Sequence, residues 1–336
     1  MSLASYVLRR VLLIVPTLFG VSLLTFALSR VVPGDPARLA AGAQATPEMY
    51  AQIRREFGLD DPLPVQYWNY LTGLFRGDWG QSILSRRPVL DDLKVYWPAT
   101  LELVLFAMLI AVAVGVPLGI LAAVRADRPA DQVSRVIALL GVSLPAFWLA
   151  ILFQILFGLR LGWLPVGGRL DTLAEAPATV SGLYTVDSLL AGDWSTLGGS
   201  LRQLVLPAIT LSFPAMATIM RFTRATLLET LGQDYVRTAR AKGAAERRVV
   251  TRHALRNALI PTVTMIGLSF GWAMGGSVLV ETVFDWPGLG LYATKSALTL
   301  DFMPIMGIAL LYGLVFSLIN ILVDVTYGAL DPRVSR

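Results

Sequence analysis

The sequence of 336 residues contains no cysteine and only one histidine. The lack of cysteine excludes a disulfide framework and any thiolate metal site, and one histidine cannot build a histidine-based metal centre. Charged residues are also scarce, at 15% of the chain, whereas hydrophobic residues make up 55%. This number of charged residues is too small to cover a large core with a solvated surface. The composition therefore indicates an integral membrane protein.

Six uncharged windows are long enough to cross a bilayer, because a helix needs about 20 residues to span about 30 Å of hydrocarbon. The first window exceeds the apolar part of a signal peptide, so we expect it to be a retained span. The sequence therefore predicts an all-α integral membrane protein with six transmembrane helices. The windows hold 18 to 24 residues and cover 11–29, 103–124, 136–159, 203–220, 257–280 and 302–323.

Lysine and arginine are unevenly distributed among the connections between these windows. If the N-terminus is cytoplasmic, the inner segments hold 16 basic residues in 67 positions, and the outer segments hold 12 in 135. The positive-inside rule then places both termini in the cytoplasm. The formal net charge of +5 reports this topology and gives no indication of nucleic-acid binding.

The connection of residues 30–98 is long enough to form a helical extracytoplasmic insert between the first two spans. Thr-Pro-Glu at 46–48 is a capped helix start, and Gly58 is a stop signal. A second helix is expected over 64–75, before a turn at 77–80. The outer connection of residues 160–203 has no clear periodicity and is expected to be irregular.

Small residues recur every four positions in two of the windows, a spacing that lets helix backbones approach closely. Close packing within the chain is the favoured interpretation, while packing against a second subunit and lining a pathway are the alternatives. The two faces consist of Ala111, Gly115 and Gly119, and of Gly267, Gly271 and Gly275.

Three prolines, Pro117, Pro145 and Pro214, lie inside windows and should kink or locally open their helices.

No motif for catalysis is present, and the chain is not expected to be an enzyme. The stretch "GLGLYATKS" superficially resembles a phosphate loop, but Thr294 stands where such a loop needs glycine before Lys295. Ion-coupled transport requires ionisable groups within the spans. Only Glu102 and Asp324 qualify, and both lie at span ends, where hydrogen bonding of the helix end is the favoured role. Energy must therefore come from a partner or an ion gradient.

The longest inner connection contains "DYVRTARAKGAAERRVVTRHALRNALIP", residues 234–261. Apolar residues at helical spacing on both sides of Gly243 predict a short helix, a bend and a second helix along the membrane surface. His253 is expected to be solvated or to cap a helix. Three explanations remain open for this basic segment: binding of anionic membrane lipid, positive-inside bias alone, and docking to a protein.

This segment resembles the EAA loop of ABC-importer permeases, in particular the branch that imports peptides, nickel and glutathione. Counted back from Gly243, the Glu-Ala-Ala positions hold Arg237, Thr238 and Ala239, so arginine replaces the glutamate, and Pro261 follows about five residues later than usual. Further passages match in order: "RRVLLIVPTLFGVSLLTFALSRVVPGDP", "FGLDDPLPVQYWNYL", "GDWGQS", "PATLEL", "ETVFDWPGLG" and "NILVDVTYGALDPR".

The resemblance implies a type I permease fold and a transport role. In this family the segment around Ala239 to Ala245 is a coupling helix that lies in a groove of a cytoplasmic ATPase. The resemblance also suggests that the passage "ETVFDWPGLG" forms a gate outside the membrane or contacts the binding protein. The coupling residues would be Tyr235, Arg237, Thr238, Ala239, Lys242, Gly243, Ala244 and Arg247. The outer contacts would be Glu281, Asp285, Trp286, Pro287 and Gly288.

The resemblance further implies the partners of the chain. They are a second homologous permease, two ABC ATPases that bind ATP and magnesium, and an extracytoplasmic solute-binding protein, in a bacterial or archaeal cytoplasmic membrane. This chain itself would hold no cofactor and bind no nucleic acid. The expected division is an N-terminal helix with the insert at 1–96, a permease core at 97–330 and a tail at 331–336.

Di- or oligopeptides are the expected cargo. Nickel chelates, glutathione and oligosaccharides are alternatives for the same machine, and a stand-alone ion-coupled carrier is an alternative of another class.

Overall fold

The computed structural model describes residues 3–31, 35–42, 44–171 and 173–330, and nearly all of its regular structure is helical. The predicted tail at 331–336 lies outside these ranges. Within them, β pairing is limited to an isolated bridge between Gln81 and Pro88. The helices are α1 (Leu3–Val31), α2 (Pro36–Ala41), α3 (Pro47–Glu56), α4 (Leu63–Phe75), α5 (Val89–Val124), α6 (Pro129–Ser143), α7 (Ala146–Phe153), the π-helix η1 (Gln154–Arg160), α8 (Tyr184–Ala191), α9 (Trp194–Leu231), α10 (Asp234–Ala241), α11 (Glu246–Arg248), the π-helix η2 (Val249–Ala254), α12 (Leu255–Val283), α13 (Leu289–Leu298) and α14 (Phe302–Leu330).

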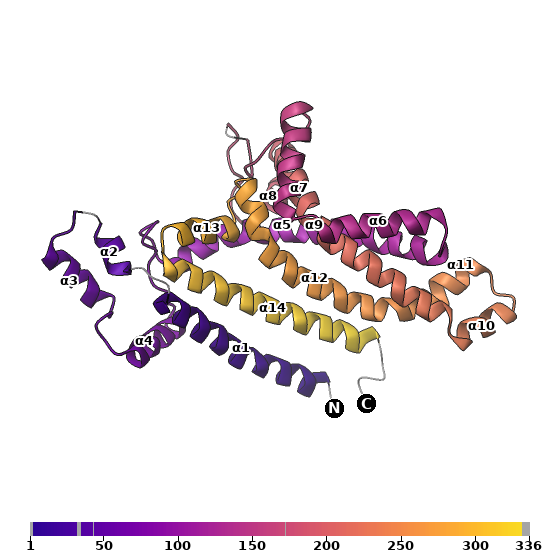
Figure 1. Ribbon diagram of the computed structural model, residues 1–336, viewed down its shortest axis with the longest axis horizontal. Helices are drawn as coiled ribbons and strands as arrows, with labels where there is room; N and C mark the ends of the chain where they lie inside the picture. The colour runs from indigo at the N-terminus through magenta and orange to yellow at the C-terminus, as the bar shows by residue number, and fades with distance from the viewer. Residues whose placement is uncertain (1–2, 32–34, 43, 172, 331–336) are drawn as a thin grey trace.

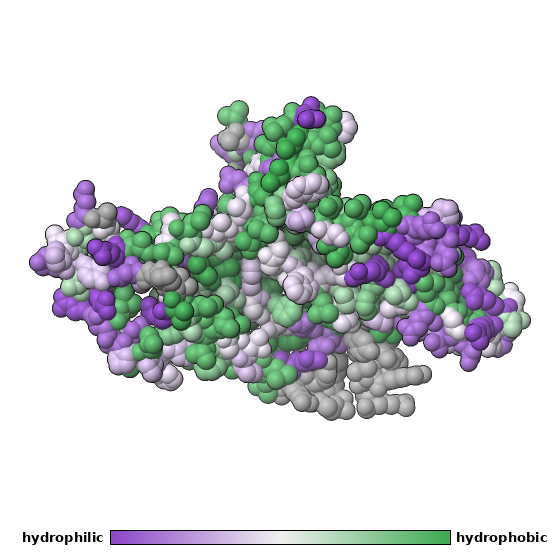
Figure 2. Space-filling view, viewed as in Figure 1, coloured by the Kyte–Doolittle hydropathy of each residue, from purple (hydrophilic) through white to green (hydrophobic). Residues whose placement is uncertain are grey.

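Five long helices, α1, α5, α9, α12 and α14, run along the long axis of the molecule (Figure 1). The helix α9 is central, because it packs against both α5 and α12, while α1 packs against α14. Helices α2 to α4 gather at one end, called the insert end below, and α10 and α11 lie at the other, the ridge end (Figure 1). Hydrophobic residues dominate the visible middle of the molecule, and hydrophilic residues gather at both ends (Figure 2).

Five helices of the described chain are long and apolar enough to cross a membrane, and six if one bent pair counts as a span. The bent pair is α6 with α7 and η1, which together cover the predicted span 136–159, and the chain bends by 103° between its two parts. The predicted kink at Pro145 is therefore confirmed, as a break between two helices. Pro145 begins the second part without a backbone N–H, and Leu144 before it is extended, as a residue before proline prefers. By contrast, Pro117 and Pro214 lie inside uninterrupted α5 and α9.

The segment after this bend, α7 and η1, projects from the bundle as an arm (Figure 1). Leu149 and Ala150 near its base are buried, but many of its other apolar side chains are exposed, and the arm is predominantly hydrophobic in the space-filling view (Figure 2). An exposed apolar arm of this kind requires lipid or another protein to cover it. Its exposed residues include Phe147, Trp148, Ile151, Leu152, Ile155, Leu156 and Leu159.

The predicted helices of the insert are confirmed as α3 and α4. Thr46 caps α3 through its side chain, and Gly58 after it has a left-handed φ of 61°. The short helix α2 is not predicted by the sequence pattern, and the Asp35 side chain caps it by accepting from Ala37 and Arg38 backbone N–H groups. A hydrogen bond from the Tyr50 hydroxyl lowers the pKa of Asp35.

The connection of residues 160–203 is only partly irregular, because it contains α8 and the start of α9. A buried ion pair fixes it to α5: Arg169 donates to the Glu102 carboxylate through Nε and a terminal nitrogen, at 3.0 and 2.6 Å. The other oxygen of Glu102 accepts from the backbone N–H and the hydroxyl of Thr185, each at 2.7 Å. The Arg169 guanidinium also stacks on the Tyr184 ring, with 3.7 Å to the ring centroid.

The small-residue faces lie against other helices of the same chain. A Cβ added at Gly119 would come within 2.6 Å of the Met220 carbonyl oxygen, on α9. On α12, the neighbours of Gly267 and Gly271 are Val323 and Phe316 of α14. Gly275 differs, because a Cβ there would meet no described atom within 4 Å. These positions let α5 approach α9 and α12 approach α14.

We expect Gly119→Ala to lower the thermal midpoint of the detergent-solubilised protein. Alanine normally favours a helix over glycine by about 1 kcal/mol. Here the new methyl would overlap the Met220 oxygen and lie 2.7 Å from Thr223 Cβ, which overpacks the α5–α9 contact. The matched control is Gly20→Ala on α1, where a Cβ meets nothing within 4 Å and the midpoint should stay or rise. Equal midpoints for the two variants would contradict the close contact.

Candidate functional site

The first candidate feature is the basic ridge, defined as residues 234–248, which comprises α10, a turn and α11. Val236 is fully buried and joins Leu227, Val249 and Ala254 in an apolar cluster. This cluster also takes in Ala123 at the end of α5. The ridge is therefore fixed by packing to the ends of α5 and α9 and to η2, which leads into α12.

The turn of the ridge depends on Gly243, which has a left-handed φ of 76°. Its N–H donates to the Arg240 carbonyl at 2.9 Å, and the Ala244 N–H donates to the Ala239 carbonyl at 3.2 Å, which closes the end of α10. Arg240 also donates to both carboxylate oxygens of Glu246, at 3.1 and 2.6 Å, across the turn. These hydrogen bonds raise the pKa of Arg240, so its guanidinium stays charged.

The predicted coupling residues form one continuous stretch at the ridge end, but they do not all face outward. Ala239 and Ala244 are half-buried against the apolar cluster and so help to seat the ridge. The sequence pattern missed the Arg240–Glu246 pair and the bond from Asn257 to the Tyr235 hydroxyl at 2.7 Å. The exposed members are Tyr235, Arg237, Thr238, Lys242, Gly243 and Arg247.

The second candidate feature is residues 281–291, which link α12 to α13 and are called the outer motif because the sequence predicts them to lie outside the membrane. The Glu281 carboxylate is fully buried, and it accepts from the Thr100 hydroxyl at 2.8 Å and from the backbone N–H groups of Gly290 and Leu291 at 2.6 and 3.2 Å. It therefore occupies the N-terminus of α13, where unpaired N–H groups favour an anion. An internal carboxylate thus takes the place that a phosphate would need in "GLGLYATKS".

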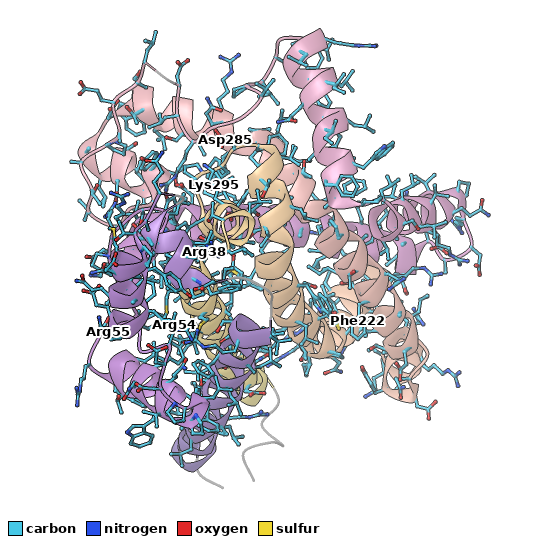
Figure 3. All side chains as sticks on the ribbon, turned by 60° about the vertical axis from the view of Figure 1, so that its left-hand side comes forward. Arg38, Arg54, Arg55, Phe222, Asp285 and Lys295 are labelled. Carbon is cyan, nitrogen blue, oxygen red and sulfur yellow. The ribbon has the colours of Figure 1, made fainter. Side chains whose placement is uncertain are left out.

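The predicted outer contacts divide into buried and exposed residues. Trp286 is buried, and its indole N–H donates to the Ala99 carbonyl at 2.9 Å, while Gly288 is buried against Glu281. Pro287 is half-buried, and Asp285 is exposed with a left-handed φ of 46°. Asp285 lies on the same side of the molecule as Lys295 of α13 (Figure 3). Of the five, Asp285 is therefore the residue best placed to meet another molecule.

We expect Gly288→Ala to disrupt the outer motif. A Cβ at this position would lie 2.5 Å from both the Glu281 carboxylate and the Thr100 hydroxyl, so it would separate Glu281 from Thr100. The result should be a lower thermal midpoint and faster proteolysis of the 281–300 connection. A suitable control is Gly198→Ala, because Gly198 is helical and has nothing within 4 Å of a Cβ. Unchanged proteolysis in Gly288→Ala would refute the assigned contact.

Groups of three or more histidine, aspartate or glutamate residues that could hold a metal do not occur in the described ranges.

Comparison with known families identifies the class of the chain. The family described as "Binding-protein-dependent transport system inner membrane component" matches residues 115–336. A second model, of the N-terminal part of such membrane components, matches residues 3–104. The chain belongs to this family of permeases. The permease is therefore a multi-pass membrane protein of a bacterial inner-membrane transport system and not a catalytic subunit.

Curated relatives match the permease along almost its whole length. A probable D,D-dipeptide transport system permease protein of Escherichia coli is 45% identical over 94% of the permease and 93% of its own length. A dipeptide transport system permease protein of Alkalihalophilus pseudofirmus is 40% identical over 98% and 99%. A glutathione transport system permease protein of Salmonella choleraesuis is 42% identical over 98% of each chain.

Proposed function

We propose that the permease forms half of the translocation pathway of an ATP-driven ABC importer for di- and oligopeptides. The observation that carries the proposal is the full-length similarity to dipeptide permeases, at 40 to 45% identity. Glutathione, itself a peptide, is an alternative cargo because a glutathione permease is 42% identical. Nickel chelates and oligosaccharides remain further alternatives for the same machine.

In the proposed orientation the basic ridge and both termini face the cytoplasm. The ridge supports this orientation because five of its 15 residues are basic. Figure 1 agrees with it, since α1 begins and α14 ends on the side nearer the ridge end. Residues 1–96 would then form the first span and an extracytoplasmic insert, and residues 97–330 would form the permease core.

The ridge is proposed to couple ATP hydrolysis to movement of the spans. The ridge connects α9 to η2 and α12, and α9 packs against α12. Because buried Val236 and Val249 seat the ridge on the helix ends, a force on its exposed face would move α9 and α12 as rigid bodies.

A second homologous permease would cover the apolar arm of α7 and η1. Two ATPases would bind ATP and magnesium, so the permease itself would need no cofactor.

The insert end is proposed to receive the solute-binding protein. Arg38, Arg54 and Arg55 lie on the insert, and Asp285 and Lys295 lie on the α12–α13 side of the same end (Figure 3). Such a charged surface suits a transient, water-accessible contact.

A stand-alone ion-coupled carrier is less well supported. Glu102 is engaged by Arg169, and Asp324 pairs with Arg10 at 2.9 Å, so the ionisable groups considered for a relay already have partners.

Uptake by the reconstituted assembly tests both the mechanism and the cargo. The permease, its co-purifying partners and the solute-binding protein are placed in proteoliposomes with labelled dialanine, glutathione or a nickel chelate. We expect dialanine uptake that requires enclosed ATP and is undiminished when ion gradients are dissipated. The proposal would be overturned if the permease without its partners took up dialanine in response to a proton gradient. If the assembly used ATP to take up only the nickel chelate, the proposed cargo would change from peptides to nickel chelates.

A further inference from the structure

A cavity of about 390 Å³ lies at the insert end, where helix α4 meets the ends of α1 and α14. Phe26 and Arg30 of α1 line one part, and Gln66 and Tyr70 of α4 line another. Asp301, directly before α14, lines a third. Figure 1 shows how these three helices come together at this end of the molecule. The volume falls within the range of small-molecule sites, about 300 to 1,000 Å³.

Four residues that line this cavity each have a buried polar atom with no hydrogen-bond partner among the described residues. These atoms are Arg30 Nε, Gln66 Oε1, Tyr70 OH and Asp301 Oδ1. Buried polar atoms of folded proteins nearly always have partners, because an unpaired one loses the hydrogen bonds that water would give it. Four such atoms around one cavity indicate that a molecule inside it supplies the partners.

The four atoms divide into two donors and two acceptors. Arg30 and Tyr70 donate, and burial raises the pKa of Tyr70, so its hydroxyl keeps its proton. Gln66 Oε1 and Asp301 Oδ1 accept, since the Gln66 nitrogen already donates to the Asp61 carbonyl at 2.7 Å. A guanidinium and a carboxylate thus line the same cavity, yet neither forms an ion pair with any described residue.

Contacts on both sides hold the walls of the cavity in place. On one side, the Tyr70 ring stacks on Phe26 with 6.1 Å between centroids, and the Arg30 guanidinium lies 5.1 Å from the same ring centroid. On the other side, the second Asp301 oxygen accepts from the Ser82 hydroxyl at 2.7 Å and from the Leu84 N–H at 3.0 Å. The acceptor and donors are therefore preorganised, which lowers the entropic cost of binding.

We propose that this cavity binds a zwitterion that carries an anionic group and a primary ammonium. The anion accepts from Arg30 and Tyr70, and the ammonium donates to Asp301 and Gln66. Two sources share this chemistry: the headgroup of phosphatidylethanolamine and a free zwitterionic peptide. A quaternary ammonium, as in phosphatidylcholine, has no N–H to donate, and an acetylated peptide has lost its positive charge, so both should bind poorly.

Binding to the intact assembly, purified without the solute-binding protein, tests the site and separates the two sources. In one arm, native mass spectrometry scores the lipid retained from nanodiscs that contain equal amounts of phosphatidylethanolamine and phosphatidylcholine. In the other arm, calorimetry compares dialanine with N-acetyl-dialanine. We expect selective binding of phosphatidylethanolamine or of dialanine, and the positive arm identifies the source.

Variants tie any binding to this cavity. Arg30→Met and Tyr70→Phe each remove one donor, and we expect binding to weaken about tenfold or more for Arg30→Met and less for Tyr70→Phe. Tyr312→Phe is the matched control, because Tyr312 also has a buried hydroxyl without a described partner but does not line the cavity. Thermal midpoints verify that each variant is folded.

The proposal is overturned if neither probe binds, if the primary ammonium gives no selectivity, or if Arg30→Met and Tyr70→Phe bind as tightly as Tyr312→Phe. The cavity would then hold only water. Because the readout is binding and not uptake, the outcome is independent of whether the permease proves to import peptides.

Discussion

Replacing Gly243 by proline is expected to abolish peptide uptake while the assembly still inserts into the membrane. Proline fixes φ near −65°, whereas Gly243 has a φ of 76°. Proline also removes the N–H that donates to the Arg240 carbonyl. The turn must therefore re-form with α10 in another direction, and the ridge no longer presents the surface that would couple to an ATPase. Parallel assays of uptake and of ATP hydrolysis in proteoliposomes measure the effect.

Two further variants make this result interpretable. Gly192→Pro is the matched control, because Gly192 also has a left-handed φ, of 68°, and an N–H that donates a hydrogen bond. Gly192 lies just before the start of α9, whereas the ridge follows the other end of that helix. We expect it to retain ATP-linked uptake. Gly243→Asn, which tolerates left-handed φ, should retain most of the activity. Normal stimulation of ATP hydrolysis by loaded binding protein in Gly243→Pro would show that the ridge does not couple.

The second large effect is expected from Glu102→Ala. This change leaves the Arg169 guanidinium buried without its carboxylate, and removing one partner of a buried pair costs about 3 to 5 kcal/mol. It also removes the acceptor for Thr185, so the connection that carries α8 should detach from α5. A large fall in the thermal midpoint and new protease sites within 160–203 are the expected observations.

The double variant Glu102→Ala/Arg169→Ala tests the cause. If the unpaired charge is responsible, the double variant should be more stable than Glu102→Ala alone. Asp91→Ala on the same helix breaks the exposed pair with Lys94 and should change the midpoint little. Equal loss of stability in Asp91→Ala and Glu102→Ala would contradict the importance of the buried pair.

The sequence predicts the helices of this fold well where the signal is local. Thr46 and Gly58 bound α3 as expected, because a cap and a left-handed stop act within one turn of the helix. The uncharged window 136–159 forms a bent pair of helices, and the sequence predicts the kink at Pro145 but not its size of 103°. Composition measures length and hydrophobicity only, whereas the extended Leu144 before Pro145 decides the direction of the chain.

The candidate site shows the same division between local and long-range information. The bend at Gly243 is predictable, because glycine between two periodic segments favours a left-handed turn. The roles of Glu102 and Glu281 are not, because their partners are distant along the chain. Arg169 is 67 positions from Glu102, and Thr100 is 181 positions from Glu281, so no local pattern brings either pair together.

Photo-crosslinking from α10 tests most directly whether the basic ridge contacts an ATPase. The chain has no cysteine, so a benzophenone attached to Thr238→Cys labels one position only. Thr238 is exposed on the ridge, and exposed Ser195, at the start of α9, provides the control position. We predict a crosslink from Thr238→Cys to the ATPase subunit and none from Ser195→Cys. An assembly that imports peptide on ATP yet gives no ATPase crosslink from Thr238→Cys or from exposed Ala241→Cys would contradict the account.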